Sequence, residues 1–120
     1  MASLSTRKPL STKWHAMPKD PGNMNRFLLE AAYAFQGVSL TVFSTHTEWF
    51  GDPAEQTAFI AGKAKAAAAD GPVLLLGDFN VEPNGANNNA PSASSLAVIY
   101  DGDILRSSTP VTCTGQKPQG

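Results

Sequence analysis

Residues 73–80 read VLLLGDFN, and the fold is best interpreted outward from this stretch. The apolar run over residues 73–76 is too short for a helix and fits a β-strand buried on both faces. Two polar residues, Asp78 and Asn80, follow where this strand ends. Strand ends are rigid and lie beside loops that open clefts, so we expect a functional site here.

The segment before this strand is predicted to be a helix. Asp52 suits the N-cap, Pro53 the first helical position, and Glu55 the third position of a capping box. The alanine-rich sequence that follows has high helix propensity, and the Asp-Gly-Pro sequence at residues 70–72 ends it. We interpret this helix as one that packs on a sheet.

A hairpin is predicted further upstream. Residues 26–35 fit both a helical stripe and a strand alternation, whereas residues 38–45 alternate and are rich in β-formers. Gln36-Gly37 between them is a short turn candidate, so we favour a hairpin over a helix followed by a strand. The first 25 residues contain several prolines and predict extended chain with at most one short strand.

The remainder of the chain has weaker signals. We expect a polar, Asn- and Pro-rich surface loop at residues 82–95, overlapping a short helix within residues 92–100. Residues 104–105 are a candidate for a further short buried piece, and within residues 109–120 the sequence predicts only a short strand at residues 111–113. We treat residues 1–120 as a single domain of the α/β class.

Composition narrows the class of protein. The chain has 120 residues and one Cys, which excludes a disulfide-stapled miniprotein and a zinc site of four cysteines. Its net charge of −1 shows no overall excess of positive charge of the kind that nucleic-acid-binding proteins carry. The charge is uneven, however, because residues 1–26 hold five basic residues and one acidic residue. The acidic remainder can act on phosphates if a metal ion sits in it. No apolar run approaches the roughly 20 residues that a membrane helix needs, and the N-terminus lacks the apolar region of a signal peptide. We therefore expect a soluble chain and assign no compartment.

Polar residues at two predicted strand ends carry the chemistry. Ser44-Thr45-His46 closes the second strand of the hairpin, and Asp78 and Asn80 close the later one. The carboxylate suits activation of a water or binding of a divalent cation, the imidazole suits donation to a phosphoryl oxygen, and the amide suits positioning of a phosphate. Taken singly, such residues are more often turn formers or structural groups. His15 has no partner at an informative spacing and is assigned no role.

Together these residues resemble the endonuclease/exonuclease/phosphatase superfamily, the deoxyribonuclease-I-like phosphoesterases. Residues 6–10 are similar to the family's Ser-Arg-x-Pro-Leu segment, and residues 44–46 to its Asn-Thr-His-Leu motif. Residues 77–80 match its Gly-Asp-Phe-Asn motif without a change, with Asp78 lying 32 residues after His46. Gln56 stands where the family's crossover helix often carries a glutamine.

The resemblance implies part of a four-layer α/β sandwich, whose mixed and mostly antiparallel sheet has a crossover helix. It also implies Mg²⁺ or Mn²⁺ as cofactor and hydrolysis of a phosphodiester or phosphomonoester, in a nucleic acid or a small phosphorylated molecule. His46 and Asp78 would be catalytic, the first on the scissile phosphate and the second on the attacking water, and Asn80 would bind the substrate phosphate. No metal ligand is assigned.

The chain also departs from the family pattern. Ser44 and Thr47 replace the usual Asn and Leu, and no histidine follows His46 to form the closing Ser-Asp-His motif. The family's metal-binding Glu precedes the segment with which this sequence begins. We therefore expect a partial domain that is weakly active or inactive alone, with an exposed apolar sheet face that lowers stability or promotes self-association. The alternative is a non-catalytic remnant or binding module with the same fold.

Overall fold

The structure is a computed structural model of the chain. It describes residues 5–19, 24–48, 53–81, 94–100 and 105. Its elements in chain order are β1 (Ser11–Ala16), β2 (Phe27–Phe35), β3 (Val38–His46), α1 (Ala54–Ala68), β4 (Val73–Asp78) and α2 (Ser94–Tyr100). The predicted α/β class is confirmed.

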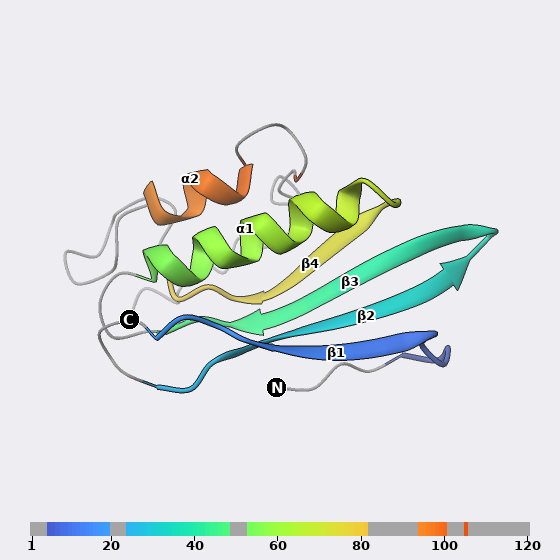
Figure 1. The fold of residues 1–120 in the computed structure, drawn as a ribbon, viewed down its shortest axis with the longest axis horizontal. Helices are drawn as coiled ribbons and strands as arrows, with labels where there is room; N and C mark the ends of the chain where they lie inside the picture. The colour runs from blue at the N-terminus through green and yellow to red at the C-terminus, as the bar shows by residue number, and fades with distance from the viewer. Residues whose placement is uncertain (1–4, 20–23, 49–52, 82–93, 101–104, 106–120) are drawn as a thin grey trace, which may run out of the picture.

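The four strands form one sheet in the order β1-β2-β3-β4 (Figure 1). β1 pairs with β2 and β2 with β3 in antiparallel fashion, whereas β3 and β4 are parallel. A parallel pair needs a crossover connection, which α1 supplies between β3 and β4. The sheet is therefore mixed and mostly antiparallel, and α1 and α2 lie on the same side of it (Figure 1).

The hairpin forms where the sequence predicts it. Gln36 and Gly37 connect β2 to β3 with φ values of 49° and 77°. Two central residues with positive φ match the twist of the flanking strands, which makes such two-residue turns the preferred hairpin connection. The first 25 residues, for which the sequence predicts at most one short strand, contain β1.

The start of α1 differs in detail from the prediction. The cap position is Pro53 rather than Asp52, and it makes no side-chain capping hydrogen bond. Pro53 has a φ of −79°, near the helical value that its ring imposes, and its carbonyl accepts the first helical bond from the Thr57 N–H at 2.9 Å. The helix therefore starts on a preset backbone, and Asp52 lies outside the described residues.

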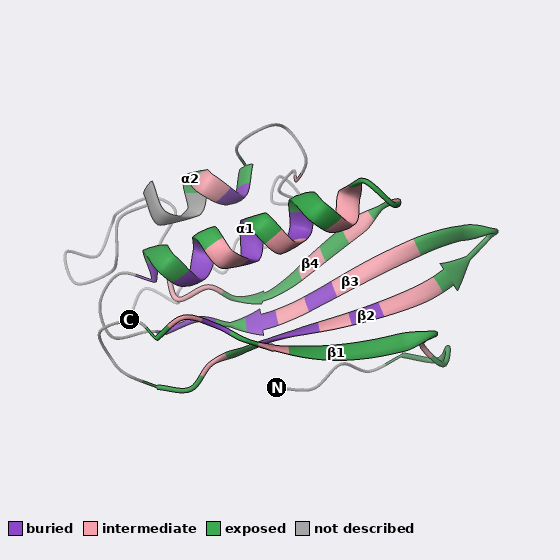
Figure 2. Cartoon of the chain, viewed as in Figure 1, coloured by how far each residue is buried: buried purple, intermediate pink, exposed green. Residues whose placement is uncertain are grey.

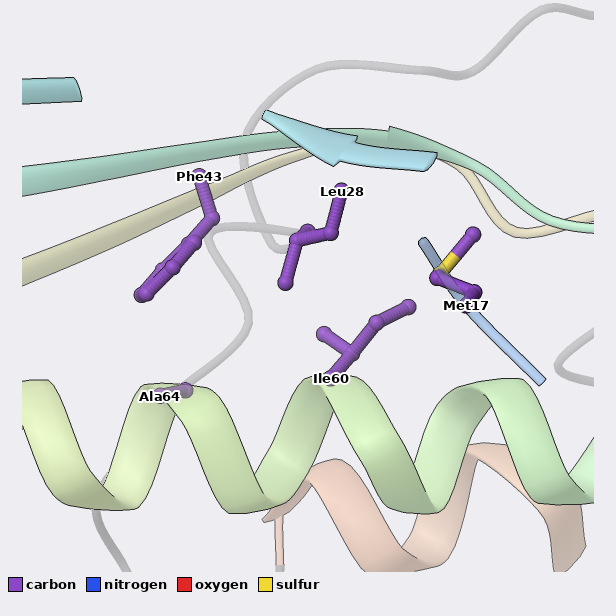
Figure 3. Close-up of a cluster of buried hydrophobic side chains, with 5 residues drawn as sticks. All are labelled: Met17, Leu28, Phe43, Ile60 and Ala64. Carbon is purple, nitrogen blue, oxygen red and sulfur yellow. The ribbon is translucent and has the colours of Figure 1, made fainter. Parts of the chain in front are cut away.

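The core lies between α1 and the sheet. Leu28 of β2 and Phe43 of β3 point toward Ile60 and Ala64 of α1, and Met17 completes the buried cluster (Figure 3). Buried positions accordingly follow the inner side of α1, the first half of β2 and the second half of β3 (Figure 2). Burying these side chains is the main contribution to stability in a domain of this size.

The opposite face of the sheet is apolar and is exposed around a buried centre formed by Leu29 and Ala31. Side chains alternate along a strand, so the neighbours of Leu28 and Phe43 point away from α1. The prediction that the β4 run is buried on both faces is wrong, because Leu74 and Leu76 are 46% and 48% exposed. The two described helices lie on the other side of the sheet (Figure 1). The exposed large side chains that define the apolar face are Trp14, Phe27, Phe35, Val38, Leu74 and Leu76.

Several predicted segments fall at the margin of the described chain. The helix predicted within residues 92–100 is α2. Residues 82–93 of the predicted loop and the strand predicted at residues 111–113 lie outside the described residues. Within the described part of the chain, no helix is long and apolar enough to cross a membrane.

Candidate functional site

The parallel pairing of β3 and β4 brings the two predicted catalytic residues together. His46 and Asp78 are register partners at the last position of their strands. His46 Nε2 lies 3.9 Å from Asp78 Oδ2, and the two side chains are 47% and 67% exposed. Because parallel strands end at the same edge of a sheet, the imidazole and the carboxylate lie next to each other at that edge. Both are accessible to solvent there.

A glycine allows the two strand ends to approach this closely. Gly77 is the register partner of Thr45, and a Cβ on Gly77 would overlap the Thr45 carbonyl oxygen. Gly77 also has a φ of 152°, which side-chain-bearing residues rarely adopt. The Thr47 N–H continues the ladder by donating to the Asp78 carbonyl at 3.0 Å. The glycine before Asp78 thus has a steric reason to be there.

Asn80 is fixed beside this pair by two hydrogen bonds. Its backbone N–H donates to Asp78 Oδ1 at 2.9 Å, and its side-chain Nδ2 donates to the Thr47 carbonyl at 2.9 Å. The turn that results gives Asn80 a positive φ of 49°, which asparagine tolerates better than most residues. Asp78 therefore has one oxygen held by the turn and the other directed toward His46.

Two further residues reach the site although no motif marks them. Arg26 Nη1 lies 3.4 Å from His46 Nδ1, and Arg26 Nη2 lies 3.8 Å from Glu48 Oε1. The Arg26 side chain is 13% exposed and that of Glu48 only 1%. The predicted hairpin contains a usable signal, because pairing its two strands places residue 26 beside the residues that follow His46.

The buried Glu48 is anchored to α1. Its N–H donates to Gln56 Oε1 at 2.8 Å, and Gln56 Nε2 donates to the Pro18 carbonyl at 3.0 Å. Gln56 is fully buried, which explains a polar residue on the inner side of the helix. The end of β3, the start of α1 and the segment after β1 are thus joined by one polar network.

The described residues do not by themselves form a metal centre. Among them, no group of three or more His, Cys, Asp or Glu side chains is placed to hold a metal ion. The Glu48 carboxylate is buried against Arg26, whereas that of Asp78 is exposed. The implied Mg²⁺ or Mn²⁺ therefore lacks a ligand set in this part of the chain, and no reaction step is assigned to it.

A second histidine–carboxylate pair lies elsewhere on the sheet. His15 Nε2 is 2.6 Å from Glu30 Oε2, with side chains 18% and 24% exposed. The two residues belong to β1 and β2, inside an antiparallel ladder. The sequence spacing indicated no partner for His15, and strand pairing supplies one.

Comparison with known proteins does not extend these observations. Neither the protein-family models nor the curated proteins nor the solved structures contain a match to this chain. The function is therefore argued from the strand-end geometry. Its elements are the exposed His46–Asp78 pair, the oriented Asn80 and the Arg26–Glu48 support behind His46.

Proposed function

We propose that this chain carries part of the active site of a metal-dependent phosphoester hydrolase of the endonuclease/exonuclease/phosphatase type. The observation that supports the proposal is the meeting of His46 and Asp78 at the shared end of β3 and β4, with both side chains open to solvent. An imidazole and a carboxylate at a rigid strand end are groups that acid–base chemistry on a phosphate ester needs.

Each residue has a role that follows from its contacts. Asp78 holds Oδ1 in the turn and presents Oδ2, which aligns the attacking water. The exposed His46 ring donates to a phosphoryl oxygen, and Asn80, held by Thr47, positions the phosphate. Bound Mg²⁺ or Mn²⁺ would supply Lewis-acid chemistry on the phosphoryl oxygens, and the described residues include no ligand set for it.

The finer architecture is also part of the proposal. A four-layer sandwich would place a second sheet against the apolar face, where Leu74 and Leu76 are exposed. Without that layer, a second copy of the chain would cover the face by self-association. The substrate class is a phosphodiester or phosphomonoester, in nucleic acid or in a small molecule.

A hydrolysis assay tests the proposed function. Bis(4-nitrophenyl) phosphate is incubated with the protein and Mg²⁺ or Mn²⁺, and release of 4-nitrophenolate is followed with and without EDTA. We expect slow turnover that EDTA abolishes and that Asp78→Ala reduces to background, whereas Glu30→Gln retains it. Turnover unaffected by Asp78→Ala would contradict the assignment.

The alternative function is a non-catalytic binding module. It would show binding of a phosphodiester without turnover, insensitive to EDTA and to loss of His46. The exposure of Asp78 beside His46 supports a functional role for the pair, since a pair that only stabilises the fold gains little at a solvated site. The turnover assay decides between the hydrolase and the binding module.

A further inference from the structure

Arg26 contacts the candidate site through the Nδ1 atom of His46, and the proposed function gives it no role. It lies one residue before β2, and its backbone carbonyl accepts the Met17 N–H at 3.0 Å. Its side chain is largely buried and extends between Glu48 and His46. A buried arginine in contact with an exposed, chemically active histidine is suited to orient that histidine.

A hydrogen bond between Arg26 and His46 requires one particular tautomer of the imidazole ring. A guanidinium carries five N–H donors and no acceptor. A hydrogen bond across the 3.4 Å between Arg26 Nη1 and His46 Nδ1 therefore requires Nδ1 to be the acceptor and to carry no hydrogen. The hydrogen of the neutral ring is then on Nε2, the nitrogen that lies 3.9 Å from Asp78 Oδ2.

We infer that Arg26 is a positioning residue that fixes the His46 imidazole in the Nε2–H tautomer and directs this donor to the Asp78 side of the site. Glu48 holds the guanidinium from its other edge, with Nη2 and Oε1 3.8 Å apart. Gln56 fixes the Glu48 backbone from α1, which makes the support rigid. The interaction chain runs from Gln56 through Glu48 and Arg26 to His46.

The consequence for catalysis rests on the proposed function. With Nε2–H fixed, His46 offers a hydrogen-bond donor to a phosphoryl oxygen beside the carboxylate that aligns the water. In the other tautomer Nε2 would be an acceptor and would repel that oxygen. A residue that sets the tautomer of an active histidine without touching the substrate typically changes activity by about 10- to 100-fold.

The tautomer can be measured directly. The protein has two histidines, so ¹⁵N spectra of the imidazole rings are assigned by comparing wild type with His15→Gln. Spectra are recorded without substrate at about pH 9, above the ordinary titration range of imidazole. We expect His46 to be almost entirely Nε2–H in the wild type, to become a mixture in Arg26→Met, and to stay largely Nε2–H in Arg26→Lys, which keeps a donor.

Folding is controlled within the same experiment. Arg26→Met leaves the buried Glu48 carboxylate without its arginine, so the Arg26→Met, Glu48→Gln double variant is prepared as well, and unchanged His15 ring signals report an intact sheet. A wild-type His46 in the Nδ1–H form, or a tautomer unchanged in both folded Met variants, would overturn the inference. Activity is measured separately. Loss of activity with an unchanged tautomer contradicts Arg26 as a positioning residue, whereas the expected tautomers in an inactive protein contradict only the hydrolase function.

Discussion

The two histidine–carboxylate pairs of this sheet have the same chemical groups in different settings. His15 and Glu30 are 2.6 Å apart and mostly shielded, within the antiparallel ladder of β1 and β2. His46 and Asp78 are 3.9 Å apart and largely exposed, at the ends of the parallel strands β3 and β4. The two side chains of the first pair contact each other, whereas those of the second pair are accessible to another molecule.

The difference shows that contact distance alone does not identify a functional pair. The closer pair makes its hydrogen bond within the protein and is largely shielded from solvent, which is typical of a structural group. The looser pair is supported from outside, with Arg26 on the His46 ring and Asn80 on the Asp78 carboxylate. Support from neighbours combined with an open face is the arrangement of groups that act on a ligand.

The largest expected effect is on catalysis. We predict that His46→Gln lowers the rate of phosphodiester hydrolysis by about 10²- to 10⁴-fold, the usual contribution of a positioned acid–base group. His15→Gln should change the rate by less than about twofold, because this residue does not touch the site. Steady-state kinetics on the two variants provide the measurement, and equal losses in both would remove the distinction between the pairs.

Gly77→Ala should separate the strand ends that hold the second pair. The added Cβ meets the Thr45 carbonyl and the φ of 152° is unfavourable, so we expect destabilisation by about 2 kcal/mol or more in urea unfolding. Gly62→Ala is the matched control, since nothing lies within 4 Å of its Cβ. At this position in α1, alanine should stabilise by about 0.5–1 kcal/mol. Equal stability of wild type and Gly77→Ala would show that the close approach is not required.

The pairs should also differ in their contribution to stability. Glu30→Gln weakens a shielded contact with His15, and we expect a loss of about 1 kcal/mol in the free energy of unfolding. Asp78→Asn should leave stability nearly unchanged, because Asp78 is exposed and Asn keeps an acceptor for the Asn80 N–H. Chemical denaturation of both variants checks this, and a larger loss for Asp78→Asn would reverse the assignment of structural and functional pairs.

The smallest effect concerns the face on which the second pair lies. Strand alternation places His46 and Asp78 on the same side of the sheet as Leu76. We predict a concentration-dependent rise in mass in analytical ultracentrifugation that Leu76→Lys reduces and that Ala66→Lys, at an exposed position of α1, does not. A strictly monomeric wild type over the whole concentration range would contradict self-association through the apolar face.

The sequence allowed the local structure to be predicted better than its surroundings. Alternation and the Gln36-Gly37 turn located the hairpin, and the Gly-Asp-Phe-Asn motif placed Asp78 at a strand end with His46. The burial of β4 was wrong because an apolar run indicates a strand but not whether a second layer covers it. The burial of a strand depends on distant parts of the chain.

Side-chain pairings across the sheet were the other feature that was not predicted, although the predicted hairpin already places residue 26 beside the residues that follow His46. His15 meets Glu30, and Arg26 meets His46, only once strand register is fixed. Nothing in the sequence around Glu48 indicates that it is buried. Its backbone is fixed by Gln56 from the start of α1, a contact that only the folded chain shows. Side-chain partners across strands therefore need the register, which composition and periodicity alone do not supply.

One titration tests the central claim, that the strand end with His46 and Asp78 takes a phosphate ester while the His15–Glu30 pair is structural. Dimethyl phosphate is added with Mg²⁺ to the ¹⁵N-labelled protein, and both imidazole rings are followed in one spectrum. We predict saturable shifts of the His46 ring signals that are lost in Asp78→Ala, with the His15 ring signals unchanged. Shifts at His15 alone, or no shift at His46 up to the solubility limit of the ester, would contradict it.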